Sequence, residues 1–155
     1  MQNRGKQFEV KFEEDWLKIS GSTIDRLPDI MSGYKSISGI CDFIGYHFPN
    51  IFYIECKSIK GNTFPLVNLS QYEKLIEKVG IEGVRVGVVL WYIDHDKVLY
   101  VPISSVKKMK EDGKKSINIK MLKEKDYDMI EIPSVKKRVF LDSDYSIMMS
   151  LEENW

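Results

Sequence analysis

Three residues on two neighbouring apolar segments have side chains suited to metal-dependent chemistry: Asp42, Glu55 and Lys57. Segments 39–46 and 51–58 are rich in strand-forming residues and are separated by turn residues, so we expect an antiparallel hairpin. A symmetric turn places Asp42 directly opposite Glu55. Facing carboxylates repel each other unless a cation lies between them, and Lys57 shares their face of the strand. This arrangement suits hydrolysis of a phosphodiester with a divalent cation.

The tripeptide Glu55-Cys56-Lys57 is a weak signal when taken alone. Glu-x-Lys is common on strands, where it usually forms a solvated face. The aspartate across the hairpin strengthens the functional interpretation. An odd-length turn or a bulge would instead shift the register and separate the two carboxylates.

The two cysteines of the chain, Cys41 and Cys56, also face each other in this register, on the side of the hairpin away from the carboxylates. Two cysteines and two histidines are too few for the usual four-ligand zinc site. We interpret both thiols as small buried hydrophobic groups.

Length and composition predict one domain, residues 1–155, with residues 104–155 forming C-terminal accessory elements. With 43% hydrophobic and 30% charged residues, the chain has the composition of a globular protein. No apolar stretch approaches the roughly 20 residues of a membrane span, and the polar start does not resemble a secretory signal. We therefore expect a cytoplasmic protein with no membrane partner.

The net charge is zero, but the charges are unevenly distributed. Residues 101–140 contain eleven Lys or Arg and six acids, whereas residues 141–155 contain four acids and no base. A locally basic surface is possible on this count, and ordinary solvated lysines explain it equally well.

The order of hydrophobic patterns predicts an α/β (α+β) fold, with a mixed central sheet flanked by helices. Asn3 is the expected N-cap of the first helix, whose apolar stripe belongs to the core, and Ser70 is the expected cap of the second. The predicted helices are 3–19, 70–79 and 104–113. The predicted strands, besides the hairpin, are 22–27, 83–92, 98–102 and 129–133, and residues 29–38 are expected to form a loop.

Several short motifs, in this order along the chain, resemble those of the RecU-like Holliday junction resolvases of the PD-(D/E)xK nuclease superfamily. They are Asn3-Arg4-Gly5 with Glu9, Asp42, Glu55-Cys56-Lys57, Phe64-Pro65-Leu66 and Gly113-Lys114-Lys115-Ser116-Ile117. Cys41 stands where the superfamily's name places Pro. The segment before Asp42 is shorter than the junction-entering stalk of the cellular enzymes, which fits a compact, phage-type member.

The resemblance implies a restriction-endonuclease-like core and a Mg²⁺-dependent endonuclease, with Mn²⁺ able to substitute. Asp42, Glu55 and the backbone carbonyl of Cys56 would bind the metal. Lys57 would act on the attacking water and on the charge of the transition state. Glu9 would add an acidic group from the first helix, and Gln71 matches the family's polar residue on the second.

The implied substrate is four-way junction DNA, which a homodimer would cut with paired symmetric incisions. Sequence-independent phosphate contacts are expected from basic residues near the site: Arg4, Lys6, Arg26, Lys35 and Lys60. Two alternatives remain open from the residues. One is a restriction or nicking enzyme with the same metal site, and the other is a non-catalytic DNA-binding recombination regulator. The intact carboxylate pair and Lys57 argue against the second.

Overall fold

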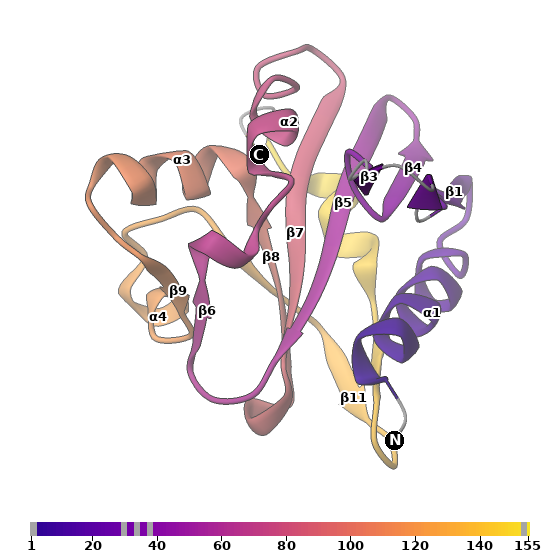
Figure 1. Cartoon of the computed structure of the whole chain (residues 1–155). Helices are drawn as coiled ribbons and strands as arrows, with labels where there is room; N and C mark the ends of the chain where they lie inside the picture. The colour runs from indigo at the N-terminus through magenta and orange to yellow at the C-terminus, as the bar shows by residue number, and fades with distance from the viewer. Residues whose placement is uncertain (1–2, 29–30, 33–34, 37–38, 153–154) are drawn as a thin grey trace.

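A twisted six-stranded sheet forms the centre of the protein in the computed structural model, which describes residues 3–28, 31–32, 35–36, 39–152 and 155 (Figure 1). The strand order is β1-β4-β5-β7-β8-β10. The pair β5 and β7 is parallel, and the other neighbours are antiparallel. The bounds are β1 Ser22–Arg26, β4 Phe43–His47, β5 Asn50–Ile59, β7 Val84–Tyr92, β8 Lys97–Pro102 and β10 Ile130–Ile132.

Helices and small two-stranded sheets complete the fold. The α-helices are α1 Arg4–Trp16, α2 Tyr72–Ile76, α3 Ile103–Glu111 and α4 Met121–Glu124. The 3-10 helices are η1 Leu66–Asn68, η2 Ile93–His95 and η3 Tyr145–Ser150. The paired short strands are β2 Met31–Ser32 with β3 Lys35–Ser36, β6 Thr63–Pro65 with β9 Ser116–Asn118, and β11 Ser134–Lys136 with β12 Leu141–Ser143.

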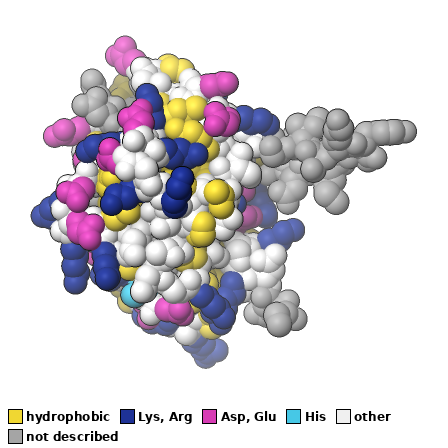
Figure 2. Space-filling model, turned by 60° about the vertical axis from the view of Figure 1, so that its left-hand side comes forward, with side chains coloured by type: hydrophobic (Ala, Val, Ile, Leu, Met, Phe, Trp, Pro, Cys, Tyr) yellow, Lys and Arg dark blue, Asp and Glu magenta, His cyan; other side chains and the backbone are white. Residues whose placement is uncertain are grey.

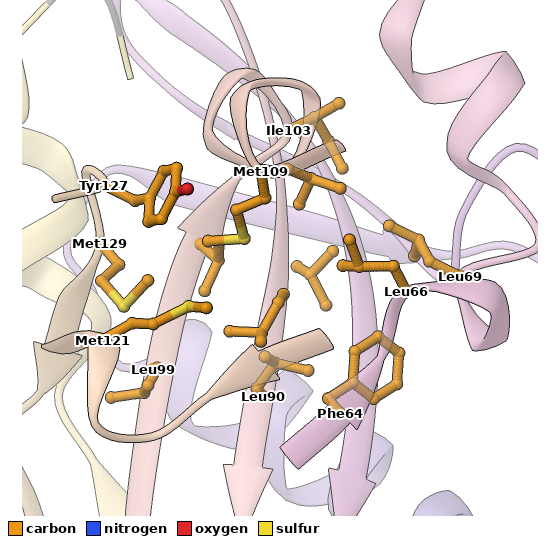
Figure 3. Packing of buried hydrophobic residues seen from close by; sticks show 14 of the residues in the cluster. Phe64, Leu66, Leu69, Leu90, Leu99, Ile103, Met109, Met121, Tyr127 and Met129 are labelled. Atoms are coloured by element: carbon orange, nitrogen blue, oxygen red, sulfur yellow. The ribbon is translucent and has the colours of Figure 1, made fainter. Parts of the chain in front are cut away.

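Each face of the central sheet is covered by its own hydrophobic core, and the predicted mixed sheet with flanking helices is confirmed. On the α1 side, Phe8, Phe12 and Trp16 pack on the sheet together with Tyr145 of η3. On the α3 side, α2, α3, α4 and the β6–β9 pair contribute Leu75, Met109, Met121, Phe64 and Ile117, among others (Figure 3). We call these the α1-side core and the α3-side core. The central strands are therefore fixed from both faces.

Helix α1 begins as predicted, because the Asn3 side chain accepts hydrogen bonds from the amides of Gly5 and Lys6. It ends at Trp16 rather than Ile19. The Ser22 hydroxyl donates to the carbonyls of Trp16 and Ile19, which satisfies the end of the helix in a tight turn. The predicted apolar stripe is confirmed as core.

Three other sequence predictions need correction. Ser70 does not cap the second helix, because its hydroxyl bonds the Gln71 side chain and the regular helix spans only Tyr72–Ile76. The third helix, predicted for residues 104–113, spans Ile103–Glu111, and the Ser105 hydroxyl within it donates to the Asp128 carbonyl. Within 29–38, where a loop was expected, β2 pairs with β3, whereas 29–30, 33–34 and 37–38 lie outside the described residues.

The hairpin of β4 and β5 has the register that the sequence predicts. His47 pairs with Asn50, Gly45 with Phe52, and the ladder ends where Phe43 meets Ile54. Beyond that point β5 continues beside β7 as far as Ile59. Among the described residues, no helix is both long and apolar enough to cross a membrane.

Candidate active site

The candidate site lies at a fork in the sheet, where the ladder between β4 and β5 stops at Phe43, the first residue of β4, and β5 continues. Asp42 precedes β4, and its carbonyl accepts a hydrogen bond of 2.8 Å from the Leu27 amide. Its carboxylate Oδ2 accepts a bond of 2.9 Å from the amide of Cys56. The side chain of Asp42 thus satisfies a strand amide that no longer has a β4 partner, because the ladder has ended at Ile54. This bond fixes one carboxylate against the open edge of β5.

Glu55 is held on this edge in an unfavourable electrostatic environment. The residue is 2% exposed, and its Oε2 has no hydrogen-bond partner among the described residues. Burial raises the pKa of Glu55 to about 9, and hydrogen-bonding contact with Asp42 and the charges of Asp42 and Glu9 add to the rise. The charge of Lys57 acts in the opposite direction. The two carboxyl groups therefore lie together, as the register predicts.

Lys57 and Glu9 bring further charges to the fork. The Lys57 ammonium lies 3.7 Å from Glu55 Oε1 and is partly exposed. Glu9 comes from the first half of α1, and its carboxylate lies 2.6 Å from the guanidinium of Arg26. Arg26 ends β1 opposite Phe43, one residue from Asp42. The pairing of Arg26 with Glu9 was not predicted, because it depends on how α1 packs across β1.

A divalent cation fits the donor groups of this fork. A cation between the two carboxylates would neutralise their repulsion and give the unpartnered Glu55 oxygen a ligand bond. The Cys56 carbonyl points to the same edge as its amide, because the N–H and C=O groups of one residue point to the same side of an extended strand. In the described part of the chain, no three His, Cys, Asp or Glu side chains form a group that could hold a metal. The donor set is thus two carboxylates and one carbonyl.

The predicted pairing of the two cysteines is wrong. Both are free and buried, but Cys41 packs in the α3-side core and Cys56 in the α1-side core. Cys41 lies before the start of β4, where the alternation of the hairpin no longer applies. Burial raises the pKa of Cys41 to about 12, with a further contribution from Glu55. It therefore remains a neutral thiol, as its interpretation as a hydrophobic group requires.

Gln71 and the predicted phosphate-contact residue Lys60 lie outside the fork contacts described above. Gln71 precedes α2, and its side chain accepts a bond from the Ser70 hydroxyl. No described contact joins it to the fork, so its catalytic role stays a prediction. Lys60 is exposed just beyond the end of β5, and the side chain of Lys35 lies outside the described residues.

Comparison with known proteins identifies the family. The family model for RecU, recombination protein U, matches residues 7–141. The chain belongs to the RecU family. RecU proteins are Holliday junction resolvases, a class of nuclease, and the family is dependent on divalent metals. The matched range contains every residue of the fork described above.

A solved structure supports the same fold for this RecU-family chain. It is Hjc, a Holliday junction resolvase from the archaeal hyperthermophile Archaeoglobus fulgidus. The similarity has a TM-score of 0.54 at 18% identity and covers 74% of this chain and 88% of Hjc. No curated protein sequence matches the chain.

The raised pKa of Glu55 predicts an unusual pH dependence for the metal-free protein. Between the ordinary value of 4.5 and about 9, the folded protein holds a proton that the unfolded chain releases. Stability should therefore fall as pH rises through this window, and Glu55→Gln should remove much of that fall. The check is the melting temperature in chelator from pH 5 to pH 9, with the exposed Glu131→Gln as control. Equal pH profiles for wild type and Glu55→Gln would contradict the assignment.

Proposed function

We propose that the fork is the active site of a Mg²⁺-dependent endonuclease that resolves four-way DNA junctions. The observation that carries the proposal is the buried Glu55 oxygen without a partner among the described residues, next to the Asp42 carboxyl. An unpartnered buried carboxylate oxygen costs stability, so its retention indicates a role in binding. The family assignment supplies the reaction class.

Asp42, Glu55 and the Cys56 carbonyl are the proposed metal ligands. All three offer oxygen, which suits a hard cation such as Mg²⁺, and Mn²⁺ accepts the same donors. The bound ion would lower the pKa of a water and neutralise charge on the cleaved phosphate. The Cys56 amide holds Asp42 in place for this task, because it fixes one carboxylate oxygen.

Lys57 is the proposed transition-state cation. Its ammonium lies on the face of β5 that carries Glu55 and is partly open to solvent, so a phosphate can reach it. There it would offset the negative charge that develops on the phosphate oxygens and help position the attacking water. Its distance of 3.7 Å from Glu55 is longer than a good hydrogen bond, which leaves the ammonium available.

Glu9 and Arg26 form the proposed second charged pair of the site. Glu9 orients the guanidinium of Arg26, a residue that pairs with Phe43 next to Asp42, and the guanidinium could bind a DNA phosphate through its remaining donors. Gln71 is retained as a proposed polar contact from the start of α2. These three residues would position the DNA, whereas the groups on β5 act on the scissile phosphate.

The proposed acting unit is a homodimer. A four-way junction is approximately two-fold symmetric and needs two matched cuts, and each chain offers one fork. Two copies related by a two-fold axis would present two forks to opposite strands. Hjc, which has the same fold, is itself a Holliday junction resolvase, and this supports the choice of substrate.

Removal of one metal ligand charge should stop cleavage. We expect Asp42→Asn to abolish cutting of a four-way junction in Mg²⁺, because the volume is kept and the charge is lost, while junction binding remains within a few-fold of wild type. Gel analysis of labelled junctions measures both properties, with a linear duplex of the same arms for comparison. Glu131→Gln, an exposed acid paired with Lys97, is the matched control. Near wild-type cutting by Asp42→Asn would exclude the proposed metal site.

Loss of Lys57 should act on the chemical step. Lys57→Ala is expected to lower the single-turnover rate by on the order of 10², the scale for a lost electrostatic or proton-transfer group. The rate is measured with enzyme in excess over junction. Lys97→Ala serves as control because Lys97 is also a partly exposed lysine paired with a glutamate. An effect confined to the binding affinity would remove Lys57 from the catalytic groups.

Mixing of active and inactive chains tests the dimer. After joint refolding or co-expression of wild type with Asp42→Asn, the mixed dimers should nick one strand of a junction, whereas wild type cuts two. A supercoiled plasmid that extrudes a cruciform separates these products as nicked and linear DNA. Only linear product, at a level set by the wild-type fraction, would show that one chain makes both cuts.

A further inference from the structure

The pair of short strands β6 and β9, which we call the ribbon, lies on the same side of the sheet as the candidate site. Phe64 and Ile117 of the ribbon are buried in the α3-side core. Tyr53 and Ile59 of β5 pack against that core as well. Glu55 shares their face of β5, because alternate residues of a strand point to the same side. The ribbon therefore flanks the face on which the proposed chemistry takes place.

The outer face of the ribbon carries small, uncharged side chains, and three of the four are polar. Phe64 and Ile117 pair directly and point inward, so their neighbours point outward. These outward pairs are Thr63 with Asn118 and Pro65 with Ser116. Hydroxyl and amide groups on a flat strand pair are suited to contact sugar and phosphate oxygens.

Lysines stand at both ends of this polar face and on the following helix. Lys60 and Lys120 lie at one end, where the Ile119 amide bonds the Asn62 carbonyl at 2.9 Å. Lys114 and Lys115 lie at the other end, where the Leu66 amide bonds the Lys115 carbonyl, also at 2.9 Å. Lys123 on α4 follows. All five are exposed, and we call them the ribbon lysines.

The ribbon lysines differ from several other lysines in that they have no ion-pair partner among the described residues. Residues 113–123 contain four lysines and no acid, although the whole chain has zero net charge. No ribbon lysine forms an ion pair with a described residue, whereas Lys11, Lys18, Lys97, Lys136 and Lys137 all do. In the space-filling view of this side, basic and acidic side chains surround a broad area with few charges (Figure 2).

The loop that joins the site to the ribbon is rigidly held. The Gly61 amide donates to Asp94 at 2.7 Å, and Asn62 contacts the ring of His95 at 2.6 Å. Gly61 has a positive φ of 84°, which a glycine adopts without strain. Lys60 therefore has a fixed position three residues beyond Lys57, about 10 Å along an extended chain.

We propose that the ribbon and its lysines bind the phosphate backbone of a DNA arm that leads away from the cleavage site. The ribbon lysines have no ion-pair partners among the described residues and surround a polar strip, so they complement a polyanion. They lie on the side of the sheet that carries Lys57, and they extend its positive charge along that side. This inference rests on the proposed function for the identity of the DNA. The binding free energy of this contact would come from counterion release and would be independent of base sequence.

The test compares two double variants with equal loss of charge. Lys114→Gln with Lys115→Gln removes ribbon lysines, and Lys136→Gln with Lys137→Gln removes two adjacent lysines that are ion-paired elsewhere. Binding of a four-way junction is measured in chelator, without cleavage, over a series of salt concentrations. The ribbon variant should weaken binding roughly tenfold or more at low salt and reduce the salt slope by about 1.8, or about 0.9 per lost contact. The control variant should match wild type.

Equal affinities and salt slopes for the two double variants would overturn the proposal. Lys120→Gln gives an independent reading with an expected slope change of about 0.9, should the double variant not fold. Because binding is measured without metal, failure here is distinct from failure of the proposed cleavage, which the Asp42→Asn experiment addresses. A ribbon variant that binds normally while wild type cleaves would reject the ribbon alone.

Discussion

The hydrogen bond from the Cys56 amide to the Asp42 carboxylate is the interaction on which the site depends. It forms where β4 leaves the sheet and β5 continues, so it replaces a ladder bond with a side-chain bond. Without it, the amide of a buried strand would lack a partner and Asp42 would be free to turn toward solvent. One bond therefore satisfies the backbone and places a carboxylate beside Glu55.

The remaining structure makes this fork rigid, and it makes the metal-free form of the fork energetically unfavourable. The α1-side and α3-side cores pack both faces of β5 and β7, so Glu55 cannot move away from Asp42 without disrupting a packed layer. Its burial and raised pKa are the consequence. A site that is unfavourable when metal-free gains more from a bound cation than an exposed pair of acids would. The buried fork thus lowers the stability of the metal-free protein and would raise its affinity for the proposed divalent cation.

Charge on the surface is organised around the same strand. Near the fork, the Arg26 guanidinium is paired with the Glu9 carboxylate, which sets its position in the protein alone. Beyond the fork, β5 leads directly into the ribbon, whose lysines have no carboxylate partners among the described residues. A chain of zero net charge can in this way carry a locally basic strip, because residues 113–123 contain four lysines and no acid.

The sequence by itself determined the hairpin and its register, because strand-forming residues, a short turn and a strict period of two leave few alternatives. Asp42 and Glu55 could therefore be placed together from their positions alone, and the apolar stripe of α1 could be assigned to the core. Only the tertiary structure decided where the ladder ends. That end point separates Cys41 from Cys56 and frees the Cys56 amide for Asp42, whereas the packing of α1 across β1 brings Arg26 to Glu9. These contacts join segments far apart in the chain, and their geometry depends on how α1 and the two cores pack against the sheet, which local patterns do not encode.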